Sequence, residues 1–92
     1  RSFVKVIHCI HTHRDGPFAI WQVVEETGIK RASVSRILAR LARMNYVKKV
    51  EKGFANRFWW ATKHWDFNKV IDDYETMGLI RQASAPLQHV KD

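Results

Sequence analysis

The chain has 92 residues, of which 46% are hydrophobic, and a formal net charge of +7. This length allows one hydrophobic core but not two, and no stretch approaches the roughly 18–20 apolar residues that span a membrane. We therefore expect no membrane association. The single cysteine, Cys9, excludes an internal disulfide and favours a reducing compartment, so we expect a cytoplasmic protein.

The excess positive charge lies in the middle third of the chain. Residues 30–63 contain ten basic side chains and one acidic side chain, Glu51, whereas residues 1–29 are neutral overall and residues 64–92 carry a net charge of −2. A basic block of this kind creates a local positive potential that suits a polyanion such as a nucleic acid. The alternative is a solubilising surface, but scattered surface charge would not separate so sharply.

The first two predicted helices are short and separated by a turn. The apolar residues of the first helix, expected over residues 2–13, recur with the period of an α-helix: Phe3, Val6, Ile7 and Ile10. The Arg-Asp-Gly-Pro sequence at residues 14–17 predicts the turn, and Phe18 is expected to form a very short strand after it. Residues 19–27 predict the second helix, which ends at Gly28 because glycine readily adopts the positive φ of a helix C-cap.

A third helix and a β-hairpin follow. The helix is expected over residues 31–45, with Asn45 as its stop. It would bury Val34, Ile37, Leu38, Leu41 and Met44. Residues 46–62 carry β-branched and aromatic residues on both sides of a turn and predict the hairpin. Trp59 and Trp60 should point to its opposite faces, one into the core and the other under the last helix.

The last predicted helix covers residues 66–78, with Asp66 as its N-cap. Its apolar face comprises Phe67, Val70, Ile71, Tyr74 and Met77. We assign residues 64–80 to this C-terminal helix, which either closes the core or pairs with its mate in a homodimer. The tail at residues 81–92 shows little pattern, and we expect it to be loosely ordered.

The helix expected at residues 31–45 has two chemically distinct sides. On a helical wheel, the side away from the apolar stripe comprises Ser33, Ser35, Arg36, Arg40 and Arg43. An arginine can bind a guanine edge through two hydrogen bonds, and serine hydroxyls can donate to phosphates or bases. Two short helices joined by a glycine turn form a helix-turn-helix by pattern. The third helix is therefore predicted to enter the major groove of duplex DNA.

The segment EETGIKRASVSRILARLARMNYVKKV resembles the DNA-binding segments of bacterial regulators of the MarR and IclR families. The pattern E-x-x-G, then S-V-S-R-x-L-x-x-L, then an aromatic residue and Val, is matched by Glu25, Gly28, Ile29, Ser33, Val34, Ser35, Arg36, Leu38, Leu41, Tyr46 and Val47. The resemblance covers about residues 3–62. It implies a winged helix-turn-helix in which Ser33, Ser35 and Arg36 face DNA. Lys30 departs from the pattern, because Ser, Thr or Pro usually begins the recognition helix.

Basic residues also gather in the predicted hairpin, the wing of this fold, which would contact the DNA backbone or minor groove. Such cations neutralise phosphates and release counterions. The predicted DNA-binding set is Lys30, Arg31, Ser33, Ser35, Arg36, Arg40, Arg43, Lys48, Lys49, Lys52 and Arg57. Phe54, at the expected tip of the hairpin, is predicted to fold back onto it.

The sequence HCIHTH at residues 8–13 contains residue types that bind zinc. Its spacing is poor, since His8 and His11 share one side of a helix and Cys9 turns away. We therefore predict no metal, no cofactor, and histidines on a polar face beside a semi-buried thiol. Catalytic residues are not predicted either, because the sequence has no P-loop, no activated nucleophile and no paired carboxylates.

The sequence thus predicts a mainly α protein with a small β-hairpin (α+β): a three-helix core, a wing and a C-terminal helix. Residues 1–63 would form the winged helix-turn-helix domain. The predicted function is sequence-specific binding of double-stranded DNA by a small, dimeric transcription regulator of bacterial, phage or plasmid origin, and not an enzyme. The alternatives are a DNA-binding module of a replication or recombination assembly, a winged helix used for protein contacts, and RNA binding.

Overall fold

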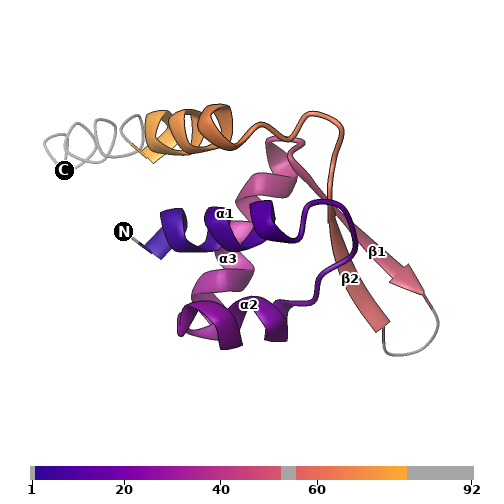
Figure 1. Ribbon diagram of the computed structural model, residues 1–92. Coiled ribbons are helices and arrows are strands. Elements are labelled where there is room, and N and C mark those ends of the chain that lie inside the picture. The colour runs from indigo at the N-terminus through magenta and orange to yellow at the C-terminus, as the bar shows by residue number, and fades with distance from the viewer. Residues whose placement is uncertain (1, 53–55, 79–92) are drawn as a thin grey trace, which may run out of the picture.

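The computed structural model describes residues 2–52 and 56–78. Its elements are α1 (Ser2–Thr12), α2 (Ile20–Thr27), α3 (Arg31–Arg43), β1 (Val47–Lys52) and β2 (Asn56–Ala61). A further helix, here called the C-terminal helix, is described over residues 67–78 (Figure 1). The expectation of a mainly helical fold with one β-hairpin is confirmed. The predictions for Phe54 and for the tail at 81–92 lie outside the described residues.

The hydrophobic core takes side chains from every helix and both strands. Its fully buried members are Val6, Ile7, Ile10, Phe18, Val23, Val34, Leu38, Leu41 and Val70. Four of the five side chains predicted to be buried on this helix are buried: Val34, Ile37, Leu38 and Leu41. The fifth, Met44, is half-buried. Burial of each such side chain contributes about 1.5–3 kcal/mol relative to exposure. One side of α3 is therefore fixed against the core, which determines the side that faces solvent.

The turn between α2 and α3 is closed by local hydrogen bonds. Gly28 has φ 72°, and its N–H donates to the Val24 carbonyl at 2.8 Å. The Thr27 hydroxyl donates to the Val23 carbonyl at 2.6 Å and accepts the Ile29 N–H at 3.2 Å. Gly28 and Thr27 thus provide hydrogen-bond donors for the last carbonyl groups of α2. The chain can therefore change direction within three residues and begin α3.

The end of α3 comes at Arg43, two residues earlier than predicted. Asn45 adopts a left-handed conformation with φ 68°. Its N–H donates to the Ala42 carbonyl at 3.0 Å, and the Tyr46 N–H donates to the Leu41 carbonyl at 2.9 Å. These two bonds form a Schellman motif, in which the last carbonyls of the helix are satisfied by the residues that leave it. Asn45 is thus the stop that the sequence indicated, but it stands just beyond the helix.

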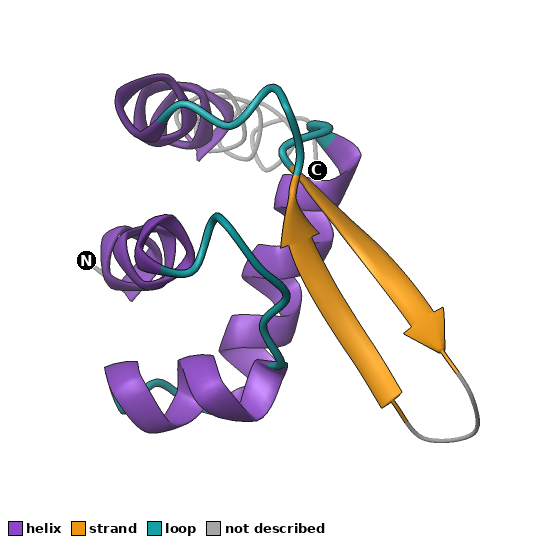
Figure 2. Ribbon diagram, turned by 45° about the vertical axis from the view of Figure 1, so that its right-hand side comes forward, coloured by secondary structure: helices purple, strands orange, loops and turns teal. Residues whose placement is uncertain are grey.

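The two strands pair in antiparallel fashion and extend away from the helices (Figure 2). Phe18 joins this sheet through one isolated bridge, in which its N–H and carbonyl bond to Trp59 at 2.9 and 2.8 Å. The very short strand predicted at Phe18 is confirmed. It ties the base of the hairpin to the turn between α1 and α2, so the orientation of the wing is set by the helical core.

The two neighbouring tryptophans of β2 have different environments. Trp59 is buried in the core, whereas Trp60 lies on the other face of the hairpin and is 40% exposed. The expectation that Trp60 packs under the last helix is wrong. Trp65 lies between β2 and the C-terminal helix instead, and its indole Nε1 donates to Nδ1 of His11 on α1 at 3.1 Å. The sequence of a strand predicts that neighbouring side chains point to opposite faces. It does not predict that Trp65, in the loop after the strand, contacts α1.

The C-terminal helix packs on the core of its own chain. Asp66 is its N-cap, since a carboxylate oxygen accepts the Lys69 N–H at 3.2 Å. Val70 is fully buried, and Tyr74 is buried as well. This helix therefore does close the core, one of the two roles that the sequence left open. Within the described ranges, no helix has the length and apolar character that crossing a bilayer requires.

Candidate nucleic-acid interface

The side of α3 opposite the buried stripe faces solvent. Its exposed residues are Arg31, Ala32, Ser35, Arg36, Ala39 and Arg43. The guanidinium groups of Arg31, Arg36 and Arg43 make no salt bridge or hydrogen bond with another described residue. The two alanines are small enough to let the helix approach a second surface closely. This side of α3 therefore carries arginines that are unpaired among the described residues, and its alanines leave room for another molecule to approach the helix.

Arg40 is placed differently from the other arginines of α3. It is half-buried, and its guanidinium carbon lies 5.2 Å from the centroid of the Tyr74 ring. This geometry is a cation–π interaction with the C-terminal helix. Ser33 is also half-buried, so the flank of α3 that carries these two residues is partly covered. Arg40, although predicted to contact DNA, is therefore held by the structure against another part of its own chain.

The N-terminus of α3 lacks a side-chain cap within the described residues. Lys30 stands at the N-cap position with φ −56° and ψ 141°, and its side chain makes no capping hydrogen bond. The first backbone N–H groups of a helix point outward with partial positive charge, and they favour a phosphate as partner. Lys30 and Arg31 are both exposed beside this end of the helix. The departure from the family pattern at Lys30 therefore leaves an open, positively charged helix end.

A hollow of about 300 Å³ lies where α2, α3 and the hairpin meet. Its lining residues are Ala19, Ile20, Trp21, Arg31, Ser35, Lys49 and Trp59. The Lys49 ammonium lies 5.9 Å from the centroid of the Trp59 ring, a cation–π contact between residues paired across the hairpin. The structure thus brings Arg31 and Ser35 of the predicted recognition helix together with Lys49 of the wing.

The predicted interface does not contain Trp21 on α2, although this residue lines the same hollow. Its side chain is 61% exposed, more than that of any other large hydrophobic residue in the described part of the chain. The sequence signal was available, because Trp21 lies outside the buried set of α2 and a bulky aromatic on a polar helix face has no packing role. Indole combines a flat apolar body with an N–H donor, which suits contact with sugar and phosphate at the edge of a groove.

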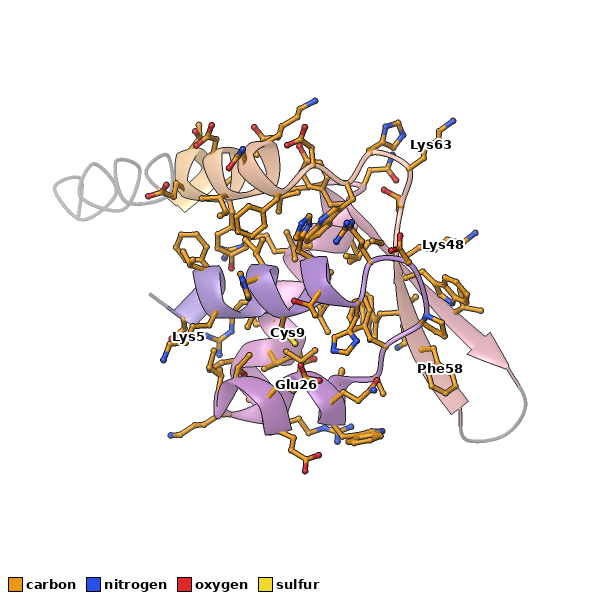
Figure 3. All side chains as sticks on the ribbon, viewed as in Figure 1. Lys5, Cys9, Glu26, Lys48, Phe58 and Lys63 are labelled. Atoms are coloured by element: carbon orange, nitrogen blue, oxygen red, sulfur yellow. The ribbon has the colours of Figure 1, made fainter. Side chains whose placement is uncertain are left out.

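The wing lysines point to different faces of the hairpin. In the strand register Lys48 pairs with Trp60 and Lys49 pairs with Trp59. Lys48 is exposed and points away from the helices (Figure 3). Lys52 and Arg57 belong to the described strands, but their side chains are outside the described part of the structure, and so their predicted role stays a prediction.

Two buried side chains have strongly raised pKa values, and both lie outside the α3 surface. Burial, the negative charge of Glu26 and a hydrogen bond to it raise the pKa of the Cys9 thiol to about 11. Burial, together with a hydrogen bond from Tyr46 to the Asp73 carboxylate, raises the pKa of the Tyr46 hydroxyl to about 12. Both groups are therefore neutral near pH 7.

Three helices, a glycine turn, a hairpin wing and an exposed basic helix face define a winged helix-turn-helix protein of the DNA-binding class. The model of the IclR helix-turn-helix domain matches residues 4–51, just over half of the 92 residues. The chain belongs to this family, as the resemblance in its sequence indicated, and it has the fold of a DNA-binding transcription regulator. Domains of this family are typically non-enzymatic. No curated protein matches the chain.

Proposed function

We propose that the protein binds specific sequences of double-stranded DNA and regulates transcription, with α3 in the major groove and the hairpin on the DNA backbone or minor groove. One observation carries this proposal. The apolar stripe of α3 is buried in the core, while Arg36 and Arg43 on its other side have no partner among the described residues. Those guanidinium groups are free to bind base edges or phosphates.

The dimensions of α3 suit this role. Its 13 residues give a helix about 20 Å long, and a B-DNA major groove about 12 Å wide admits an α-helix. Arg36 lies near the middle of the helix and is assigned to base contact. Arg43 lies at its last residue and is assigned to a phosphate. Ser35, which is exposed on the side of the hollow, is assigned to a base or a nearby phosphate.

Backbone contacts would come from the ends of this surface. The uncapped N-terminus of α3, with Lys30 and Arg31 beside it, supports one phosphate contact. Trp21 of α2 and Lys49 of β1, which both line the hollow, support further backbone contacts beside it. Arg40 is left out of the proposed contact set, because its guanidinium group is engaged with Tyr74.

Selection of bound molecules from a random duplex library tests the proposal. We expect enrichment of a short motif, bound with an affinity that falls steeply as salt increases. Retention of duplexes with no common motif would instead favour a non-specific DNA-binding module of a replication or recombination assembly. If no duplex is retained even at low salt, the basic surface serves a different partner, such as RNA or an acidic protein.

We further propose that the protein forms a homodimer through the C-terminal helix. Met77 on this helix is 41% exposed, and it lines a hollow of about 330 Å³ together with the half-buried Met44 of the α3 C-terminus. An apolar face of this kind could accept its copy across a two-fold axis. Sedimentation velocity should then show a dimer that Met77→Glu converts to a monomer, and the selected DNA motif should be palindromic. A monomer at every concentration would overturn this part of the proposal.

A further inference from the structure

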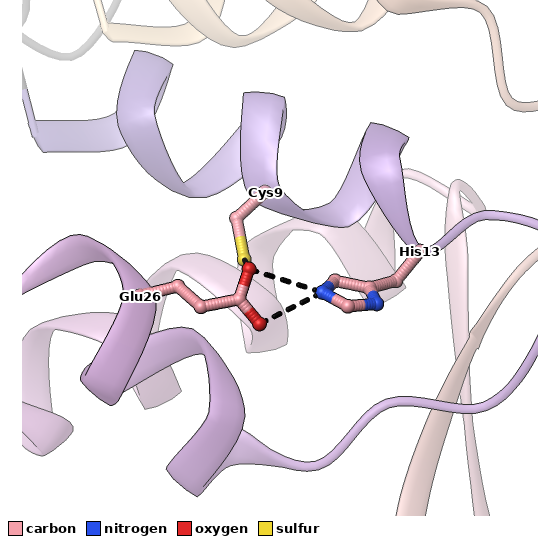
Figure 4. Close-up of side chains that lie close together, drawn as sticks. All are labelled: Cys9, His13 and Glu26. Carbon is pink, nitrogen blue, oxygen red and sulfur yellow. Dashed lines mark hydrogen bonds and ion pairs between the residues drawn. The ribbon is translucent and has the colours of Figure 1, made fainter.

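Three side chains with metal-binding atoms converge between α1 and α2 (Figure 4). Cys9 lies on α1, His13 lies directly after it, and Glu26 lies on α2. The Cys9 sulfur, a His13 ring nitrogen and a Glu26 carboxylate oxygen all lie within 4.8 Å of one another. His13 Nε2 is 2.9 and 3.1 Å from the two Glu26 oxygens, and Cys9 Sγ is 3.6 Å from one of them.

The spacing of these atoms is close to that of a tetrahedral zinc site. Zn²⁺ binds sulfur at about 2.3 Å and nitrogen or oxygen at about 2.0–2.2 Å, so neighbouring ligand atoms around it stand roughly 3–4 Å apart. Cys9 and His13 are one helical turn apart on the chain, while Glu26 comes from the neighbouring helix. Small rotations of side chains, without movement of either helix, would bring the three donors around one ion.

The chemistry of the donors selects the class of metal. The Cys9 thiol is neutral in the metal-free chain and would release its proton to solvent as the metal binds. The resulting thiolate, an imidazole and a carboxylate form a mixed set that suits Zn²⁺ or Co²⁺, whereas Mg²⁺ and Ca²⁺ prefer oxygen ligands throughout. The surroundings also allow entry. Glu26 and His13 have side chains that are 46% and 28% exposed, although Cys9 itself is buried. A cavity of about 550 Å³ borders Cys9 and Glu26 and leaves room for a fourth ligand.

We propose that Cys9, His13 and Glu26 form a zinc site with three protein ligands and one position open to water. This proposal departs from the expectation of no metal, which considered Cys9 and the histidines of the sequence but not Glu26. The proposed ion would bridge α1 and α2, and because α2 leads through the Gly28 turn into α3, it would stabilise the part of the fold that supports the α3 surface. The proposal does not depend on DNA binding, and its test uses no DNA.

Titration of the reduced, metal-free full chain with Co²⁺ tests the site, because tetrahedral Co²⁺ absorbs visible light and a Co²⁺–thiolate bond adds a charge-transfer band. We expect one equivalent of Co²⁺ to bind with both signals and one equivalent of Zn²⁺ to displace it. Competition with a chromophoric chelator then gives the zinc affinity. Zinc should also raise the melting temperature of the wild-type chain.

The variants Cys9→Ser, His13→Ala and Glu26→Gln identify the ligands. Each should weaken zinc binding at least tenfold, and Cys9→Ser should also remove the charge-transfer band. His64→Ala, an exposed histidine in the loop after β2, is the matched control and should bind zinc as the wild type does. Circular dichroism of the metal-free variants checks that they fold. The site is refuted if folded Glu26→Gln and His13→Ala bind zinc as tightly as the wild type, or if the wild type shows no charge-transfer band.

Discussion

The guanidinium group of Arg40 on α3 lies over the ring of Tyr74 on the C-terminal helix, with 5.2 Å between the guanidinium carbon and the ring centroid. The Phe3 ring of α1 stacks on the same tyrosine at 4.7 Å. Tyr74 therefore joins the C-terminal helix to α1 and α3. The family match at residues 4–51 covers all of α3 and nearly all of α1. The C-terminal helix is an integral part of the packed unit that holds α3.

Arg40→Ala should lower stability and leave DNA recognition nearly unchanged. A partly desolvated cation–π contact contributes about 0.5–2 kcal/mol, so we expect the free energy of unfolding to fall by about 1 kcal/mol. Urea denaturation measures this change. A double-mutant cycle with Tyr74→Leu should show that the two effects are coupled. A large loss of DNA affinity with no loss of stability would show instead that Arg40 leaves Tyr74 to bind DNA.

Arg36→Ala should remove sequence preference while affecting stability little, because this side chain is exposed and has no partner among the described residues. Loss of a bidentate arginine–guanine contact costs about 1–3 kcal/mol of discrimination, which is roughly a 5- to 150-fold loss of affinity for the selected site. Fluorescence anisotropy on the selected and a scrambled duplex measures both affinities. Equal losses on the two duplexes would count against a base contact by Arg36.

Lys49→Ala should weaken binding to every duplex by a similar factor. A lysine that contacts phosphate contributes through counterion release, so the slope of log affinity against log salt should become shallower by about one. Lys69→Ala, which removes an exposed lysine from the C-terminal helix far along the chain from the wing, is the control and should leave both slope and affinity unchanged. If Lys49→Ala leaves the slope intact, the wing does not touch the backbone at this residue.

The position of α3 and the identity of its buried side could be predicted from sequence because both follow from local periodicity. Val34 and Leu38 recur at helical spacing, and Gly28 marks the turn before them. The role of Arg40 could not be predicted in the same way. On a helical wheel it lies at the edge of the exposed arc, and only the crossing of the C-terminal helix places Tyr74 beneath it.

The proposed zinc ligands show the same limit. Cys9 and His13 stand one helical turn apart, which the sequence displays. Glu26 lies on α2, and its approach to α1 depends on how the two helices pack around Val23, which no local pattern specifies. Trp21 is a different case. Its position on the polar face of α2 could be predicted from the sequence, but its place in the interface depends on the hairpin, which completes the hollow.

Asn45 offers a test of the turn that ends α3. Its φ of 68° is a conformation that costs a β-branched residue about 1–2 kcal/mol but costs glycine little. Asn45→Val should therefore lower the free energy of unfolding by about that amount, whereas Asn45→Gly should be nearly neutral. Thermal and urea denaturation compare the two variants. Equal destabilisation by both would show that the asparagine side chain, and not the backbone conformation, is what the turn requires.

Tyr46 makes stability depend on pH at the alkaline end of the scale. Burial and the hydrogen bond to Asp73 raise its pKa to about 12 from an ordinary value of 10.0. A raised pKa means that the folded state favours the protonated hydroxyl. The stabilisation is thus fully present below about pH 10 and is lost as the pH rises through the folded-state pKa near 12.

Tyr46→Phe should remove this dependence, because phenylalanine keeps the ring in the core and has no proton to lose. At neutral pH the variant should be less stable by about 1.5–3 kcal/mol, the usual contribution of a hydrogen bond to a charged group. Urea denaturation between pH 8 and pH 12 follows stability, and phenolate absorbance follows the ionisation. The wild-type curve should fall toward the variant's curve as the pH approaches 12. Parallel curves across the whole range would show that the hydrogen bond to Asp73 does not stabilise the folded state.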